Sequence, residues 1–381
     1  MVVTKKIFFI LGTTFILLSN TMAEMLAPKT WTAKLLFNLY SQTSKNGAQV
    51  FDGLGNEDAL VFEPMLFLSH QIDETTNLTL NAAIDIWTAE SDTVLDGNTG
   101  QSGEGIGSQT RTSASLAYSK QVGNSIYTPR IAFSSEYDYK SFNAGLTWTG
   151  SFAEDNFTLT MSGQAFIDSV KKFDYVSELT TDFKDKRVYS FDTNASQLLT
   201  RNDIVSAGAT VIFQEGTLES IRNSTLINGV RVAESLPKTR KRFAYYGQWV
   251  HAFNDELAAS LKYRYYHDTW KLKANSIESS LRLSIFEEDG FLDLTYRFHD
   301  QSSVEYFART LTTIPTHHTS DSDLEDFSSH RVGVHYGYEL GPMKTMFMPI
   351  DNVYLTAGAY YYNRSNKLSY LTSQFGLGAV Y

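Results

Sequence analysis

Apolar and polar residues alternate along most of the chain, which is the pattern of β-strands that turn one face toward an apolar environment. In the segment 157–168 the odd positions are mostly apolar, whereas most even positions are polar. The same alternation, bounded by turn-forming residues, predicts sixteen strands. They cover 32–42, 59–70, 77–88, 111–121, 126–138, 142–152, 157–168, 203–214, 217–231, 240–253, 257–269, 273–286, 291–301, 327–340, 352–363 and 370–381.

The connections between these segments alternate between long and short over much of the chain. The long connections are polar and would share one rim; they are 43–58, 89–110, 169–202 and 302–326. The short ones would share the other rim, at 123–124, 153–156, 215–216, 254–256 and 287–290. This asymmetry is typical of an all-β protein whose strands form a transmembrane antiparallel β-barrel, with short periplasmic turns and long extracellular loops. The longest loop would be 171–203, which could fold inward as a constriction, cover the mouth, or be a mobile external loop.

The last strand ends on an aromatic residue, and its odd positions from Leu371 to Tyr381 share one mostly apolar face. It resembles the terminal strand of bacterial outer-membrane barrels, in which this end is the signal read by the barrel-insertion machinery. The resemblance implies that the signal comprises Phe375, Leu377, Ala379 and Tyr381.

The start of the chain fits export. Lys5 and Lys6 precede an apolar run at 7–18, and small residues follow near Ala23. We interpret 1–23 as a secretory signal peptide, because the apolar run is shorter than the roughly 20 residues of a membrane-spanning helix. The barrel domain would then be 24–381. Together the two ends predict the outer membrane of a Gram-negative bacterium, with its lipids and the insertion machinery as partners.

Charged residues on the strands must face inward, because Arg or Lys at the bilayer midplane costs about 2–4 kcal/mol. The predicted lumen-lining residues are Arg130, Glu136, Asp138, Lys262, Arg264, Asp268, Glu278, Arg282, Asp293, Arg297, Arg331 and His335. Folding the hairpins places Arg264 opposite Glu278, and Arg282 near Asp293. Two hypotheses follow: the charges brace the wall as a neutralised ladder, or they form an eyelet that filters charged solutes.

Composition narrows the chemistry. Cysteine is absent, which excludes disulfides, thiolate metal sites, covalently attached haem and a cysteine nucleophile. The net charge of −10 argues against a nucleic-acid partner. A mean hydropathy of −0.24 with 14% aromatic residues suits a barrel, because only alternate residues meet lipid and aromatic residues gather at the membrane interfaces.

No catalytic site is predicted, and no cofactor. His299 and His335 have inward parity near Asp293 and could act as a base or bind a metal, but no Gly-x-Ser-x-Gly elbow accompanies them. His317 and His318 precede several carboxylates, which resembles a loose divalent-cation site. These residues are Asp321, Asp323, Glu325 and Asp326, and they lack the glycine and closing glutamate of an EF-hand. We therefore expect a solvated acidic loop.

Three segments carry a family resemblance: Tyr-Arg-Tyr-Tyr-His-Asp-Thr-Trp at 263–270, Ser-Ser-Glu-Tyr-Asp-Tyr at 134–139, and Leu-Pro-Lys-Thr-Arg at 236–240. They resemble a family of uncharacterised Gram-negative outer-membrane barrels that is grouped as a domain of unknown function, with the likeness spread from about Glu57 to Tyr306. On strand parity, Arg264, Asp268 and Trp270 of the first segment would face the lumen. The resemblance implies barrel architecture, and it suggests a small periplasmic lipoprotein or redox protein as a partner.

The expected function is that of a channel or porin-like conduit for small polar solutes, since a barrel of this size can enclose an aqueous channel. The alternative is a non-transporting scaffold for the periplasmic lipoprotein or redox partner. A hydrolase located at the rim is the third hypothesis.

Overall fold

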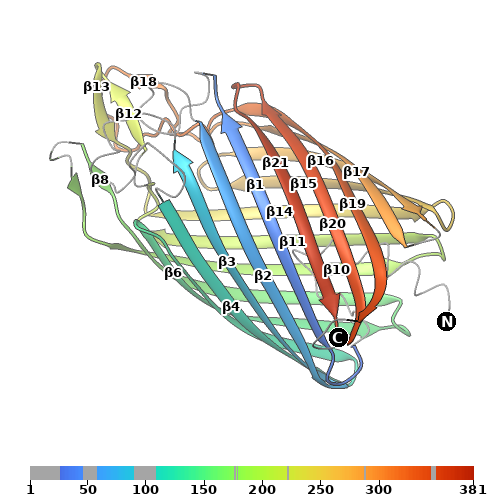
Figure 1. Ribbon diagram of the computed structural model, residues 1–381. Helices are drawn as coiled ribbons and strands as arrows, with labels where there is room; N and C mark the ends of the chain where they lie inside the picture. Colours follow the sequence, from blue (N-terminus) through green and yellow to red (C-terminus); the bar gives the residue numbers. More distant parts are fainter. Residues whose placement is uncertain are drawn as a thin grey trace.

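A computed structural model describes residues 26–45, 58–89, 109–175, 177, 179–220, 223–286, 289–344 and 349–381. Sixteen antiparallel strands form a closed barrel in which strands adjacent in the barrel are hydrogen-bonded (Figure 1). The predicted count of sixteen strands and the all-β class are therefore confirmed. In barrel order the strands are β1 (Trp31–Thr43), β2 (Ala59–Asp73), β3 (Thr76–Ala89), β4 (Gln109–Val122), β5 (Ser125–Ser135), β6 (Tyr139–Phe152), β7 (Phe157–Val170), β10 (Lys184–Leu198), β11 (Asp203–Gly216), β14 (Thr239–Ala252), β15 (Leu257–Asp268), β16 (Lys273–Ile285), β17 (Gly290–Gln301), β19 (Phe327–Lys344), β20 (Pro349–Arg364) and β21 (Ser369–Val380).

The last strand closes the barrel against the first. The register of β1 and β21 runs from Thr32 opposite Val380 to Thr43 opposite Ser369. Beyond it, the backbone N–H of Tyr381 donates to the carbonyl of Trp31 at 2.9 Å. Closure removes the free sheet edges, so every barrel strand has a hydrogen-bonded neighbour on both sides. The predicted signal peptide 1–23 lies outside the described residues.

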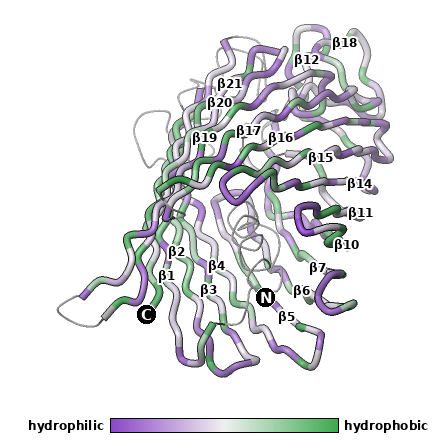
Figure 2. The backbone as a smooth tube through the Cα atoms, turned by 90° about the vertical axis from the view of Figure 1, so that its right-hand side faces the viewer, coloured by the Kyte–Doolittle hydropathy of each residue, from purple (hydrophilic) through white to green (hydrophobic). Residues whose placement is uncertain are grey.

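The outer surface of the barrel is apolar and its inner surface is polar, because alternate side chains of each strand point to opposite sides. The hydropathy of the backbone changes from residue to residue along the strands in Figure 2. Side chains on the outward positions are well exposed, as for Ile167 at 64% and Phe375 at 55%. Among the described residues, no helix is long and apolar enough to cross a membrane.

Five short strands lie outside the barrel wall: β8 (Phe173–Asp174), β9 (Leu179–Thr180), β12 (Ser224–Ile227), β13 (Val230–Ala233) and β18 (Thr310–Leu311). β13, β12 and β18 form a three-stranded sheet from two distant segments of the chain. This sheet lies at the rim opposite the C-terminus (Figure 1). We call it the rim sheet, and we call its end of the barrel the outer rim, because the long connections gather there.

One predicted strand lies outside the barrel and one barrel strand was predicted as loop, so the two errors cancel in the count. The segment 184–198 was predicted as part of a long loop, but it is the barrel strand β10, paired with β7 and β11. The segment 217–231 was predicted as a barrel strand, but its ordered part contributes β12 and β13 to the rim sheet. Polar residues at several outward positions of β10, namely Arg187, Thr193 and Gln197, hide its alternation. The segment 217–231 carries apolar residues, such as Ile227, that are buried at the rim instead.

This exchange reverses the direction assigned to β11. The connection at 215–216 therefore lies on the outer rim, and the inner turn is 199–202. The predicted 171–203 loop is reduced to 171–183, which includes the hairpin of β8 and β9. It is correspondingly too short to be the long constriction considered from the sequence.

Candidate functional site

Five basic side chains gather on one wall of the lumen, and we call them the lumenal basic cluster. They are Lys262, Arg264, Arg297, Arg331 and Arg364. The register of β15, β16, β17 and β19 joins Lys262, Glu278, Arg297 and Arg331 in one continuous row. All four occupy positions that alternate with exposed apolar residues such as Leu261. The row therefore lies on the lumen face of the sheet.

The carboxylates near this cluster are few. The Arg331 guanidinium lies 3.7 Å from a carboxylate oxygen of Glu278, and Arg364 lies 2.6 Å from Asp323 of the outer rim. Arg297 stands opposite Glu278 on one side and opposite Arg331 on the other. Within the described part of the chain, neither Lys262 nor Arg264 has a carboxylate at ion-pair distance. The cluster thus carries a local excess of positive charge.

The predicted pairing of Arg264 with Glu278 is wrong by two residues. Arg264 faces Ser276, and Lys262 is the residue opposite Glu278. The cause is the turn after β15. The Asp268 carboxylate accepts the backbone N–H groups of Trp270 and Leu272 at 2.9 and 3.1 Å, which tightens the turn around residue 270.

A buried hydrogen-bonded chain supports the wall beside the cluster. The Gln301 side-chain amide donates to the carbonyls of Asp323 and Glu325, which turns its own oxygen toward His299 at 3.2 Å. His299 Nε2 must then be the protonated nitrogen, so Nδ1 accepts the hydroxyl of Ser276 at 2.8 Å. The order resembles a nucleophile, a base and an orienting group. Ser276 is only 6% exposed, however. The hydrogen-bonded chain instead braces the wall beside Arg297, whose guanidinium lies 3.5 Å from the Ser276 hydroxyl.

Tyrosine rings accompany the basic side chains on the lumen face. The Lys262 ammonium lies 4.4 Å from the ring centre of Tyr246, and the Arg331 guanidinium lies 5.6 Å from that of Tyr360. Arg364 donates to the hydroxyl of Tyr362 at 2.8 Å. These rings stabilise the charged side chains by cation–π attraction but do not neutralise them, since a cation over a ring keeps its full charge.

Two other parts of the lumen wall carry close pairs of a basic and an acidic side chain. Arg282 lies opposite Asp293, as predicted, and its Nε donates to the carboxylate at 2.5 Å. His335 lies 3.7 Å from the same carboxylate. On another part of the wall Arg111 forms an ion pair with Asp85. These closely matched pairs fit the bracing hypothesis, whereas the lumenal basic cluster does not.

A cavity of about 310 Å³ lies against strands β2 to β7. Its lining combines apolar residues such as Phe67 and Phe133 with serines and asparagines, and Arg130 and Glu63 are its charged residues. Glu63 accepts the side-chain amide of Asn38 at 2.7 Å, and Asn38 in turn accepts that of Gln374 at 2.9 Å. The polar lining therefore continues from β5 across the closure of the barrel to β21.

Three of the predicted lumen residues lie at the outer rim instead. β5 ends at Ser135, so Glu136 and Asp138 belong to the turn before β6. Lys171 donates its backbone N–H to the carbonyl of Asp138 at 2.9 Å. Asp268 ends β15, and its side chain is fully buried. The alternation continues past the wall at these positions, which is why parity alone placed them inside.

Asp268 is the centre of the strongest polar contact of the rim. Arg240 forms a buried ion pair with it, with Nε at 2.9 Å, and the Tyr266 hydroxyl donates to it at 2.8 Å. The Arg240 guanidinium also stacks 4.2 Å from the ring centre of Trp270. Two of the three segments that carry the family resemblance therefore meet here. The partner Arg240 was not among the predicted site residues, although its segment was recognised.

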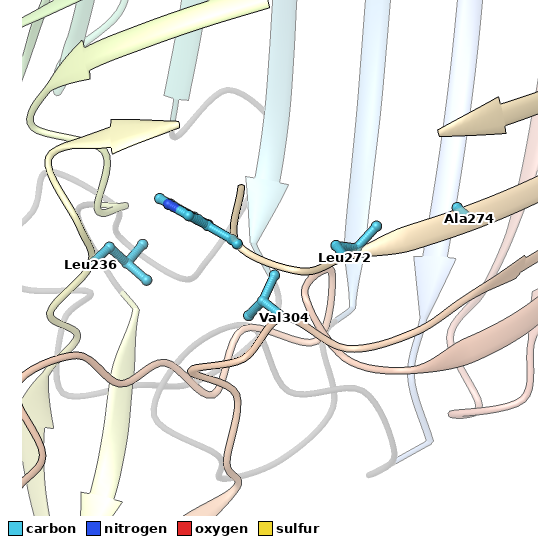
Figure 3. Packing of buried hydrophobic residues seen from close by; sticks show 5 residues of the cluster. Leu236, Leu272, Ala274 and Val304 are labelled. Atoms are coloured by element: carbon cyan, nitrogen blue, oxygen red, sulfur yellow. The ribbon is translucent and has the colours of Figure 1, made fainter. Parts of the chain in front are cut away.

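An apolar cluster covers this ion pair. It consists of Leu236, Trp270, Leu272, Ala274 and Val304. Figure 3 shows Leu236, Leu272 and Val304 converging from separate segments of the rim. Trp270 was predicted to face the lumen, but it is buried in this cluster, and its indole N–H donates to the carbonyl of Thr239 at 3.0 Å.

The rim sheet is held by buried polar groups. Glu234 accepts the backbone N–H of Ser220 at 2.6 Å and the hydroxyl of Thr319 at 2.8 Å. Burial, reinforced by the nearby Asp321, raises the pKa of Glu234 to about 8. Burial followed by repulsion from Asp323 raises the pKa of Asp321 to about 6. The rim sheet therefore contains two carboxyl groups that take up protons near neutral pH.

The carboxylates considered as a cation site go to separate partners. Glu325 binds Arg309 at 2.8 Å, Asp323 binds Arg364, and Asp321 accepts the side-chain amide of Asn223 at 2.8 Å. His318 is buried against Thr225. No group of three or more His, Asp or Glu residues among the described residues is arranged to hold a metal ion.

The four residues of the predicted insertion signal lie at the closure of the barrel. Phe375 and Leu377 are outward and exposed, and they face Phe37 and Leu35 of β1. A closed antiparallel barrel with an apolar exterior and a polar interior defines the class of transmembrane β-barrel proteins.

Comparisons with known proteins assign a family within that class. The family model described as "Protein of unknown function (DUF3570)" matches residues 88–376, and the chain belongs to this family. The match includes all three segments that carry the resemblance. It begins later than Glu57 and continues beyond Tyr306. No curated protein sequence matches the chain.

Solved structures of outer-membrane proteins are similar to the chain at low sequence identity. OccK1 (OpdK) of Pseudomonas aeruginosa has 8% identity, with a TM-score of 0.41 over 92% of this chain and 98% of that chain. A loop-deletion mutant of OmpT from Vibrio cholerae has 7% identity, with a TM-score of 0.43 over 92% and 99%. A bacterial polysaccharide outer membrane secretin has 8% identity, with a TM-score of 0.47 over 92% and 98%.

Proposed function

We propose that this protein is an outer-membrane channel that lets small polar solutes pass through its lumen. The observation that carries the proposal is the lining of a closed sixteen-stranded barrel by charged and hydroxylated side chains. Barrels of this size can enclose an aqueous channel. The cavity of about 310 Å³ along strands β2 to β7 supports this, since hydroxyl, amide and charged side chains are part of its lining.

The proposal includes how the protein reaches its membrane. The exported chain would be recognised by the barrel-insertion machinery through Phe375, Leu377, Ala379 and Tyr381. Lipid would then cover the exposed apolar exterior. No catalytic role is proposed, because the Ser276–His299 pair is engaged in bracing the wall.

Conductance across a planar lipid bilayer tests the proposal. The purified, folded barrel should insert with discrete current steps. The fold is checked independently by heating the protein in detergent, where a folded barrel should resist unfolding. A barrel that passes this check and stays silent in the bilayer would overturn the channel function. If a periplasmic lipoprotein also copurified with such a silent barrel, the result would favour the scaffold hypothesis.

A further inference from the structure

We infer that the lumenal basic cluster is an anion-binding site, which recognises the carboxylate or phosphate group of a small solute. The inference rests on the proposed function, because it names the charge of the solute that would pass. Its centre is formed by Lys262, Arg264, Arg297 and Arg331, and Glu278 is the carboxylate among them.

The first argument is that the positive side chains of the cluster outnumber the carboxylates beside them. Arg297 and Arg331 are directly opposite each other on neighbouring strands, an arrangement that is unfavourable for like charges. Glu278 lies opposite both Lys262 and Arg297, and its oxygen is 3.7 Å from Arg331. One carboxylate therefore serves three cations. A bound anion would supply the missing negative charge.

The second argument is the contrast with the rest of the lumen. Arg282 with Asp293, and Arg111 with Asp85, form close ion pairs in which each cation has its own carboxylate. A wall that needed only bracing could use the same pairing at the cluster. At the cluster, by contrast, Lys262, Arg297 and Arg331 share the single carboxylate of Glu278, and the low-dielectric wall around them strengthens their field.

The third argument is the chemistry of the donors. Arginine presents its N–H groups as a planar fork that matches two oxygens of a carboxylate or phosphate. Arg264 has no carboxylate partner among the described residues, and Arg297 has only the weak 3.5 Å contact to Ser276. The Ser276–His299–Gln301 chain fixes the wall between these two arginines. Both guanidinium groups are half-buried, so they are held in place yet remain open to the lumen.

Binding and selectivity are measured on the same folded barrel. Calorimetric titration with inorganic phosphate, and separately with acetate, should detect binding by the native barrel. Arg264→Gln combined with Arg297→Gln should weaken phosphate binding at least tenfold. The control is Arg187→Gln, which removes one positive charge from an outward position whose side chain is 56% exposed. It should change neither phosphate binding nor ion selectivity.

In a potassium chloride gradient across a planar bilayer, the native channel should prefer chloride, and the double variant should lose that preference. Arg264→Lys with Arg297→Lys keeps the charge and should retain selectivity. If the glutamine double variant fails the heating check, Arg264→Gln alone replaces it and should weaken both phosphate binding and the preference for chloride.

The outcomes separate the two proposals. A conducting barrel that binds no phosphate, or whose binding and selectivity survive the glutamine double substitution, overturns the anion site and leaves the channel standing. A silent barrel that binds phosphate in a cluster-dependent manner overturns the channel and supports the site. The site also fails if Arg187→Gln lowers binding as much as the double substitution, because net charge alone would then explain the effect.

Discussion

Replacing Asp268 by alanine should open the outer rim, because its carboxylate is fully buried and satisfies several donors at once. The substitution leaves the 6% exposed Arg240 guanidinium without its counter-ion. It also leaves the Tyr266 hydroxyl and the backbone N–H groups of Trp270 and Leu272 without their acceptor. Breaking a buried ion pair on one side costs about 3–5 kcal/mol. The expected loss for the rim lies in this range.

Hydrogen exchange at backbone amides that do not bond Asp268 measures the effect. The N–H of Val304 bonds the carbonyl of Leu324, and that of Glu305 bonds the carbonyl of Trp270, both at 2.9 Å. A loss of 3 kcal/mol in the free energy of opening would accelerate their exchange at least about a hundredfold.

Asp323→Ala is the matched control, since it removes one carboxylate from another Arg–Asp bridge of the same rim. The Asp323 side chain is 61% exposed, and Arg364 keeps its hydrogen bond to the Tyr362 hydroxyl, so the loss of Asp323 should cost less than the loss of the fully buried Asp268. Replacing Arg240 by Met and Asp268 by Leu together should recover much of the loss, because no buried charge is then left unpaired. The reasoning is refuted if Asp268→Ala accelerates exchange no more than Asp323→Ala does.

Three further predictions follow from the same contacts. The folded pKa of Glu234 is raised to about 8 and that of Asp321 to about 6, so the rim sheet is most stable below about pH 4, where both groups are protonated even when unfolded, and its stability falls as pH rises through 6 to 8. Proteolysis of 217–238 should therefore be faster at pH 9 than at pH 5. A Glu234→Gln variant with an undiminished pH dependence would contradict this. Arg264→Gln should raise the free energy of unfolding in urea by about 0.2–1 kcal/mol, since Arg264 has like-charged neighbours, whereas Glu278→Gln should lower it. Shifts in the same direction would show that charge balance does not govern this wall. Gly378→Val should destabilise the closing strand by about 1–3 kcal/mol, because a Cβ there would lie 1.9 Å from the ring of Tyr354. Gly163→Val should not destabilise its strand, because no heavy atom lies within 4 Å of the added Cβ. Equal thermal stabilities of the two variants would count against the packing argument.

Part of the candidate site follows from the sequence, and the limit is the register. Parity alone places Lys262, Glu278, Arg297 and Arg331 on one face, because side chains alternate along a strand whatever its neighbours are. Which of them touch depends on the turns between strands. The Asp268 carboxylate tightens the turn after β15, so Lys262 rather than Arg264 meets Glu278. A shift of two residues keeps the face but changes every partner.

The sequence by itself determined the barrel, its closing strand and the lipid-facing positions. These depend on a period of two residues, which is visible within each short segment of the sequence. Only the tertiary structure decided that 184–198 is a barrel strand and that 217–231 belongs to the rim. It also decided the rim contacts, where the amide of Asn223 meets Asp321 across 98 residues of chain. It brought Arg297 opposite Arg331 and left Arg264 without a carboxylate partner among the described residues. These features depend on strand pairing and loop packing between distant segments, and no local pattern of hydrophobicity encodes them.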